Sequence, residues 1–393
     1  MPVEEVSLPD AIESVDWLTN FLGLAWVRTA LQKREARLAS FPYWRPERVE
    51  ANPLIDFLAL YETHRSNLTE STFRTSRVLG TLLTHASNVR KIYPQISGPI
   101  RESLRSLLTQ DEYAAGYLYQ CSIASHYIRD GYDVEAFSIG GADEGDVVIG
   151  HGNARVELQC KVIEEGAGRK IPKPTFNLLA LRTLNRLHSF DGFALIDVRC
   201  SDRLEVRDID LIVSHMPDLL AESSPVDHHL KTYVLRVEPR LSPFKDEEVA
   251  ALLKRDPNEP FRPWHLAFRG DLDGMRRKPI TLVLMARSAK RDHVTRGVLK
   301  RARKAAGQLT GRDPGVVFVH IPEVLPSEVM AESGKFVSWL NSLLRHPNSM
   351  RVNAVVFTNE TIELHGGYDA HPLLNPKAAR PLPEGFRVVG LRE

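Results

Sequence analysis

The chain lacks the features that mark secreted, membrane-spanning or nucleotide-cofactor proteins. Its 393 residues include three cysteines, too few and too scattered for a disulfide framework. No apolar run reaches the ~18 residues of a membrane span, and the N-terminal MPVEEVSLPD lacks a secretory signal's basic and apolar regions. Walker-type phosphate loops, dinucleotide fingerprints and zinc-type Cys/His spacings are also missing. We expect a cytoplasmic protein without membrane contact.

The composition is typical of a globular protein with an ample core. Hydrophobic residues make up 43% of the chain and charged residues 26%, and the formal net charge is +1. A chain of this length predicts two or three domains. The charge is unevenly distributed, because the segment 276–312 contains twelve Lys and Arg residues against the single acid Asp292.

A predicted β-hairpin is the most informative part of the sequence. The segments 147–149 and 156–162 have the β-branched, alternating pattern of paired strands. Gly152 and Asn153 between them suit a two-residue turn, because such turns need residues that tolerate positive φ.

The register of this hairpin brings three polar side chains to one face. If His151 pairs with Ala154, antiparallel counting places Asp146 opposite Gln159. Lys161 lies two residues further along the strand and therefore points to the same face. A carboxylate, an amide oxygen and an ammonium group converge, and such a set can hold a divalent metal and a scissile phosphate.

This order of Asp, hairpin and Gln-x-Lys resembles the signature of the PD-(D/E)XK nucleases. The Gln-Cys-Lys version, with a Gly-rich approach to the Asp, is most similar to Mrr-type restriction endonucleases, over roughly residues 110–200. The resemblance implies an α/β fold with a restriction-endonuclease-like core of order αβββαβ around a mixed sheet. Its first helix would contain Tyr119 and Gln120. Its last helix would begin at Pro172, and its last strand would span 193–198.

The resemblance also implies Mg²⁺ or Mn²⁺ as cofactor and phosphodiester hydrolysis as the reaction. Asp146 would be the main metal ligand, Gln159 a neutral second ligand, and the backbone carbonyl of Cys160 a third. Lys161 would orient the attacking water and offset charge on the phosphate. By strand alternation the Cys160 thiol faces away from the site, which favours a core residue over a nucleophile.

The chain departs from the family pattern at Gly145, where many members have Pro, and at Gln120. Gln120, a candidate site residue, stands where the family often has a Glu on the first helix, and Glu112 earlier on that predicted helix is a weaker substitute. Glu157 shares the strand face of Gln159. It is either an additional ligand or a solvated residue, and we favour the solvated residue.

The sequence predicts three regions. Residues 1–108 are predicted to form a helical accessory or recognition domain, and residues 109–205 the restriction-endonuclease-like catalytic core. Residues 206–393 alternate between strand-like and helical runs, which predicts an α/β extension or a second α/β domain that includes the basic segment 276–312.

The basic residues favour DNA as a partner. A predicted helix within 293–309 has an apolar face and a basic side, and counterion release makes such a surface suited to phosphates. A second basic group follows the catalytic strand and would grip phosphates nearer the metal. The predicted nucleic-acid-binding residues are Arg296, Lys300, Arg303, Lys304, Arg169, Lys170 and Lys173.

We therefore expect a metal-dependent DNA endonuclease that acts in restriction or defence against foreign DNA. One alternative is a catalytically silent restriction-like module for DNA binding or assembly, which the neutral Gln120 and Gln159 favour. Another is an RNA-directed nuclease, because Mg²⁺ phosphodiester chemistry does not select the sugar. Expected protein partners are a second copy of the chain, for double-strand cleavage, and an ATPase or other defence subunit.

Overall fold

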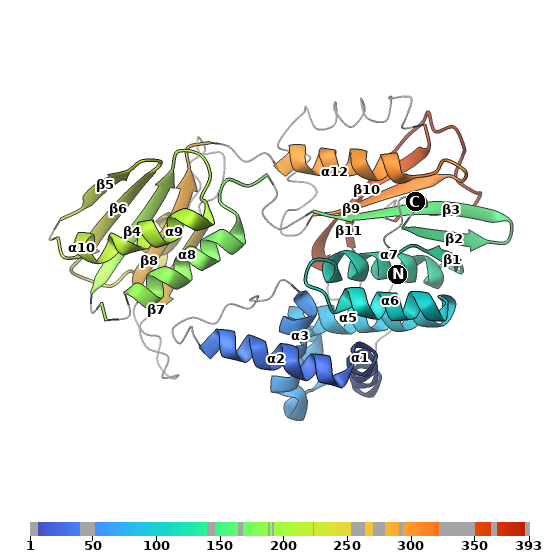
Figure 1. The fold of residues 1–393 in the computed structure, drawn as a ribbon, viewed down its shortest axis with the longest axis horizontal. Helices are drawn as coiled ribbons and strands as arrows, with labels where there is room; N and C mark the ends of the chain where they lie inside the picture. The colour runs from blue at the N-terminus through green and yellow to red at the C-terminus, as the bar shows by residue number, and fades with distance from the viewer. Residues whose placement is uncertain are drawn as a thin grey trace. The chain divides into compact units, whose positions relative to one another are not determined.

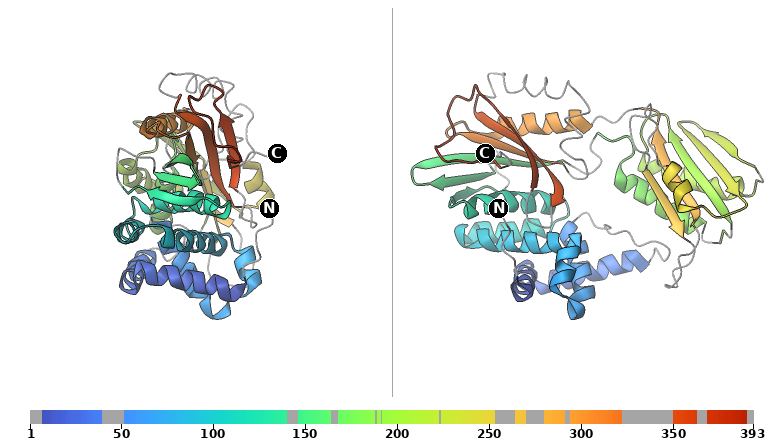
Figure 2. Two further views of the ribbon diagram at one scale, coloured as in Figure 1. Left: turned by 90° about the vertical axis from the view of Figure 1, so that its right-hand side faces the viewer. Right: turned by 180° about the vertical axis from the view of Figure 1, so that it is seen from behind.

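The structure is a computed structural model of a mixed α/β chain with two mixed sheets (Figures 1 and 2). It describes residues 7–39, 52–139, 146–163, 168–187, 189–190, 192–222, 224–252, 264–269, 280–290, 294–321, 350–362 and 368–389. The chain divides into two units. Unit 1 comprises residues 1–37, 47–164 and 295–393, and unit 2 comprises 38–46 and 165–294. Among the described residues, no helix has the length and apolar character needed to cross a membrane.

The N-terminal part of unit 1 is helical, as predicted. Helix α1 begins after Ser7, whose side chain accepts a hydrogen bond from the Asp10 N–H at 3.3 Å, and ends at Gly23 with φ +96°. The helices of this part are α1 (Leu8–Leu22), α2 (Leu24–Ala39), α3 (Pro53–His64), α4 (Glu70–Thr75), α5 (Arg77–Ile92) and α6 (Gly98–Leu108).

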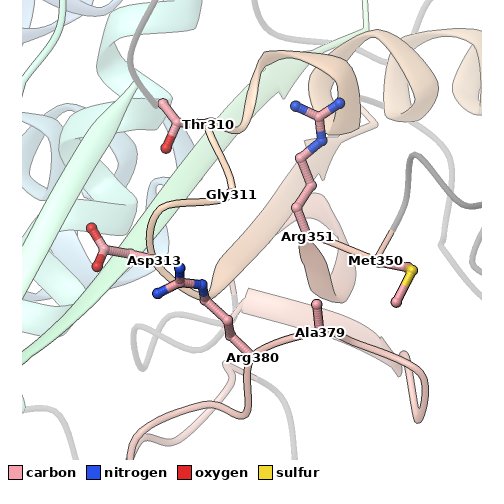
Figure 3. A pocket seen from close by; sticks show the side chains of 7 residues that line it. All are labelled: Thr310, Gly311, Asp313, Met350, Arg351, Ala379 and Arg380. Atoms are coloured by element: carbon pink, nitrogen blue, oxygen red, sulfur yellow. The ribbon is translucent and has the colours of Figure 1, made fainter.

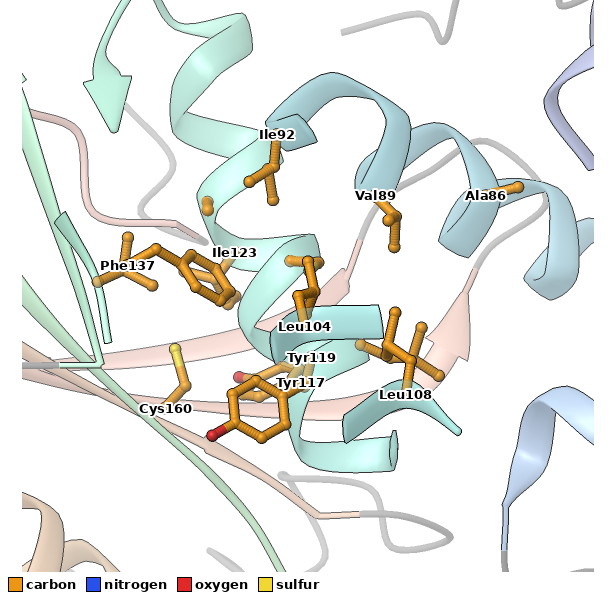
Figure 4. Close-up of a cluster of buried hydrophobic side chains, with 14 of the residues drawn as sticks. Ala86, Val89, Ile92, Leu104, Leu108, Tyr117, Tyr119, Ile123, Phe137 and Cys160 are labelled. Carbon is orange, nitrogen blue, oxygen red and sulfur yellow. The ribbon is translucent and has the colours of Figure 1, made fainter. Parts of the chain in front are cut away.

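These helices do not pack as a separate accessory domain. One hydrophobic cluster joins Leu18 of α1 and Leu54 of α3 to Ile123 of α7 (Ala114–Arg129) and to Val147 of the sheet. Figure 4 shows the part of this cluster around Ile123. The boundary predicted at residue 108 therefore falls inside a continuous core, because α7 is covered by the N-terminal helices on one side and by the sheet on the other.

Sheet A is the six-stranded sheet of unit 1. Its strands are β1 (Asp133–Phe137), β2 (Val147–His151), β3 (Ala154–Val162), β9 (Gly315–His320), β10 (Val352–Ile362) and β11 (Tyr368–Leu374), in the order β1-β2-β3-β9-β10-β11. Neighbours pair antiparallel, except that β9 runs parallel to both β3 and β10. Figure 1 shows α7 on one face of this sheet and α12 (Val294–Gln308) on the other.

Sheet B is the five-stranded sheet of unit 2, in the order β5-β6-β4-β8-β7. Its apolar face forms a second core with the helices of this unit, from residues such as Ile196, Leu235 and Leu179. The elements of unit 2 are α8 (Lys173–Arg186), β4 (Phe193–Cys200), α9 (Ile209–Ser214), α10 (Met216–Leu220), β5 (Val226–Leu230), β6 (Tyr233–Arg240), α11 (Asp246–Leu252), β7 (Trp264–Arg269) and β8 (Ile280–Ser288).

The order of the sheets corrects the predicted end of the catalytic core at residue 205. We expected α8 and β4 to complete the sheet of the hairpin, but β4 lies in sheet B and the parallel neighbour of β3 is β9. Unit 2 is thus inserted in the sequence between β3 and α12. The pairs α8–β4 and α12–β9 have the same helix-then-strand pattern, so local pattern alone does not determine which strand joins β3.

Candidate active site

The β2–β3 hairpin has the predicted register. His151 pairs with Ala154 and Val147 pairs with Leu158, and Gly152 in the turn has a φ of +61°. Asp146 directly precedes β2, so one further step in this register takes it to the position opposite Gln159.

Asp146 and Lys161 are in direct contact. The Asp146 Oδ2 atom accepts hydrogen bonds from the backbone N–H of Cys160 at 2.8 Å and from Lys161 Nζ at 3.1 Å. The Asp146 and Lys161 side chains are 14% and 19% exposed, so solvent still reaches them. The carboxylate is thereby fixed in position and remains accessible to a ligand.

Gln159 places an unsatisfied carbonyl oxygen in the same region. Its side chain is 1% exposed, and its Nε2 donates to Gln308 Oε1 of α12 at 3.4 Å. Among the described residues, Gln159 Oε1 has no hydrogen-bond partner. A buried acceptor without a partner is costly, and a cation is one group that would satisfy it. No local sequence pattern predicts this contact, because Gln308 lies 149 residues away from Gln159.

Cys160 is a core residue, as predicted. Its side chain is 4% exposed and faces α7 beside Tyr119 (Figure 4). Burial raises the pKa of its thiol well above the usual value, so the thiol is protonated at neutral pH and is no nucleophile.

Gln120 is buried on α7, at 8% exposure. In the described part of the chain, no hydrogen bond or ion pair connects it with Asp146, Gln159 or Lys161. Helix α7 packs on the sheet face that Cys160 points into, whereas Gln159 alternates to the α12 face. The structure therefore does not bring Gln120 together with the other three. Glu112 lies in an exposed turn before α7, so its predicted place on this helix is wrong.

Glu157 is buried rather than solvated, which corrects the favoured expectation. It is 3% exposed, and its carboxylate accepts hydrogen bonds from the Thr310 N–H at 2.7 Å and from the Thr310 hydroxyl. Glu157 thus ties β3 to the segment after α12, and this contact accounts for its burial without a metal.

A cavity of about 310 Å³ lies elsewhere in unit 1 (Figure 3). The Arg351 Nη1 donates to the Leu309 carbonyl at 2.5 Å, and Asp313 lies 3.8 Å from Arg155, so two of the lining groups have structural partners. None of the lining residues is a predicted site residue. They are Thr310, Gly311, Asp313, Met350, Arg351, Ala379 and Arg380.

The predicted basic residues divide between the two units. On α12, Val298 and Ala302 are buried as predicted, and the four basic residues Arg296, Lys300, Arg303 and Lys304 are exposed. Arg169, Lys170 and Lys173 belong to unit 2, whereas Asp146 belongs to unit 1. Their expected approach to the metal therefore stays a prediction.

The donor set of the hairpin fits a hard cation that keeps part of its water shell. The site is not a cluster of carboxylate, His and Cys ligands, because within the described ranges no group of three or more His, Cys, Asp and Glu side chains could hold a metal ion. The Asp146 carboxylate and Gln159 Oε1 are oxygen donors, and one or two protein oxygens are enough for Mg²⁺ when phosphate and water complete its shell.

Comparison with protein-family models, with curated proteins and with solved structures finds no match for this chain. The chemistry of the candidate site therefore rests on its own residues. These are the Asp146–Lys161 pair and the amide oxygen of Gln159, which has no partner in the described part of the chain.

Proposed function

We propose that the chain is a metal-dependent DNA endonuclease of the PD-(D/E)XK class that acts in restriction or defence against foreign DNA. The observation that carries the proposal is the convergence of Asp146, Gln159 and Lys161 at the β2–β3 hairpin, with Gln159 Oε1 buried and unpartnered within the described residues. The element order α7-β1-β2-β3-α12-β9, interrupted by unit 2, supports it because the resemblance implies an αβββαβ core.

The three side chains would divide the chemistry between them. When bound, Mg²⁺ or Mn²⁺ lowers the pKa of a coordinated water and polarises the phosphate. Asp146, Gln159 Oε1 and the Cys160 carbonyl would hold the cation. Lys161 would orient the attacking water and stabilise negative charge on the phosphate oxygens. Its present contact with Asp146 keeps the ammonium group at the carboxylate where the cation would bind.

Cleavage by the wild-type protein tests this function. We expect the protein to nick or cut plasmid and genomic DNA with Mg²⁺ or Mn²⁺ and to stop when EDTA is added. A matched single-stranded RNA substrate is assayed in parallel. Cleavage of RNA with DNA left intact would contradict the proposed substrate and favour the RNA-directed nuclease.

A non-catalytic DNA-binding module is the second candidate. It is favoured by the neutral Gln159, which leaves the site little negative charge, and by the exposed basic residues of α12. If the protein is such a module, the wild type binds DNA without cutting it, and Asp146→Ala leaves the affinity for DNA unchanged.

The basic face of α12 predicts salt-dependent binding under both candidates. We expect Lys300→Ala with Arg303→Ala to weaken DNA binding and to reduce the slope of log affinity against log salt by about two, because two phosphate contacts are lost. Fluorescence anisotropy at several salt concentrations measures both quantities. Arg28→Ala with Lys33→Ala on α2 is the control, since it removes the same charge from other exposed positions. Equal slopes for both double variants would exclude α12 as a contact.

A further inference from the structure

One end of sheet B gathers loops from four parts of unit 2. Strands β4 and β8 run parallel and end together, with Cys200 opposite Ser288. Backbone hydrogen bonds join Ala289 to Cys200, Ser201 to Thr232, and Leu204 to Lys170. In open α/β sheets, ligands bind beyond the carboxyl ends of parallel strands. We call this region, formed by segments 168–173, 199–205, 231–232 and 287–290, the cationic end.

Basic residues outnumber acidic ones in its loops. The acids are Asp202 and Glu205, and Asp202 is held by two lysines, with Lys170 Nζ on Oδ1 and Lys290 Nζ 3.2 Å from Oδ2. Hydrogen bonds from these two lysines lower the pKa of Asp202. The loop cations are Arg169, Lys170, Lys173, Arg203, Lys231 and Lys290.

Two arginines near the ends of β4 and β8 extend this surface. The Asp197 carboxylate, 1% exposed, accepts hydrogen bonds from Arg199 Nε at 2.8 Å and from Arg287 Nη2 at 2.6 Å. The arginine side chains are themselves 43% and 31% exposed. One buried carboxylate therefore orders two cationic groups that remain partly exposed to solvent.

The opposite end of sheet B has a different charge balance. There Arg240 of β6 pairs with Glu248 at 3.1 Å, and Glu248 also accepts the Lys245 N–H. The acids of α11, Asp246, Glu247 and Glu248, follow directly after Lys245 in the sequence. The described charges around Arg240 and Lys245 therefore show no positive excess, in contrast to the cationic end.

We propose that the cationic end binds the sugar-phosphate backbone of duplex DNA. Its cations lie at the ends of three adjacent strands, β6, β4 and β8, and on segment 168–173, which is hydrogen-bonded to the loop after β4. The three strands span about 10 Å at the usual strand spacing. A row of this length matches several closely spaced phosphates better than one small anion. Unit 2 would then hold the substrate that the Asp146 site cleaves, so this role rests on the proposed function.

DNA binding by Lys170→Ala with Lys290→Ala tests the proposal. We expect the affinity for a short duplex to fall about tenfold at low salt and the salt slope to decrease by about two. The control, Arg186→Ala with Lys245→Ala, removes the same charge at exposed positions near the opposite end of the sheet and should change neither quantity. A third variant, Asp202→Asn, removes the competing anion and should tighten binding, a gain that misfolding would not produce.

The outcomes separate this proposal from the proposed nuclease. DNA bound through Lys170 and Lys290 but never cut would refute the nuclease activity and support DNA binding by the cationic end. Cleavage with unaltered DNA affinity in the Lys170/Lys290 variant would refute DNA binding by the cationic end and leave the proposed nuclease activity in place. Lysine-dependent binding to phosphatidylserine vesicles, with no binding to DNA, would also overturn it by identifying a lipid surface as the partner.

Discussion

Gln159 determines how much negative charge the candidate site offers a cation. Beside it, the Asp146 carboxylate is already paired with the Lys161 ammonium group. A neutral amide oxygen contributes a dipole where a Glu would contribute a full charge, and ligand charge is one of the quantities that set the affinity for divalent cations. The site is therefore expected to bind Mg²⁺ weakly and to need a relatively high concentration of it.

Gln159→Glu should strengthen metal binding. We expect the Mg²⁺ concentration for half-maximal cleavage to fall about tenfold, which corresponds to ~1.4 kcal/mol of binding energy. Titration of cleavage with Mg²⁺, together with direct Mn²⁺ binding, measures this shift. Gln120→Glu is the matched control, because it makes the same change on α7 and should leave the metal dependence unchanged. Equal shifts in both variants, or none in Gln159→Glu, would contradict Gln159 as a ligand.

The hairpin contact could be predicted from sequence because it is local. Gly152 and Asn153 fix the register, and Asp146 and Lys161 lie only 15 residues apart. The role of Glu157 could not be predicted, since its partner Thr310 lies 153 residues further along the chain. Before the fold is known, a strand Glu beside Gln159 has the same pattern whether it binds a metal, a loop or water.

At the scale of elements, Glu157 connects β3 to the loop that leads from α12 into β9. Glu157→Ala should lower the free energy of unfolding by about 1–3 kcal/mol, because the Thr310 N–H loses its buried acceptor. Urea unfolding measures this loss. The control Glu135→Ala breaks an exposed ion pair with Arg155 and should cost less than about 1 kcal/mol. Unchanged stability with an altered Mg²⁺ requirement would instead make Glu157 a metal ligand.

The elements were easier to predict than their pairing. The alternating segments that became β2 and β3 and the amphipathic pattern of α12 are local signals, and the structure has these elements close to the expected residues. The pairing of Glu157 with Gly315 across β3 and β9 spans most of unit 2 in the sequence. No local pattern distinguishes β9 from β4 as the parallel neighbour of β3.

At the scale of the whole molecule, the two units have separate hydrophobic cores. Ile196 of β4 packs within sheet B and its helices, and Val147 packs within unit 1. Ile196→Ala should destabilise its own unit by about 2–5 kcal/mol. Hydrogen exchange should then lose protection in sheet B and keep it in sheet A, because each core opens as its own cooperative unit. An equal loss in both sheets would contradict separate cores.

The most direct test of the proposed active site is cleavage of end-labelled DNA by site variants under single-turnover conditions with Mg²⁺. We predict that Asp146→Asn and Lys161→Met lose cleavage by at least about 100-fold while DNA affinity and thermal unfolding stay near those of the wild type. Asp313→Asn, which alters a carboxylate in the loop before β9, should retain activity. Cleavage at the wild-type rate by both Asp146→Asn and Lys161→Met would contradict the assignment of this site.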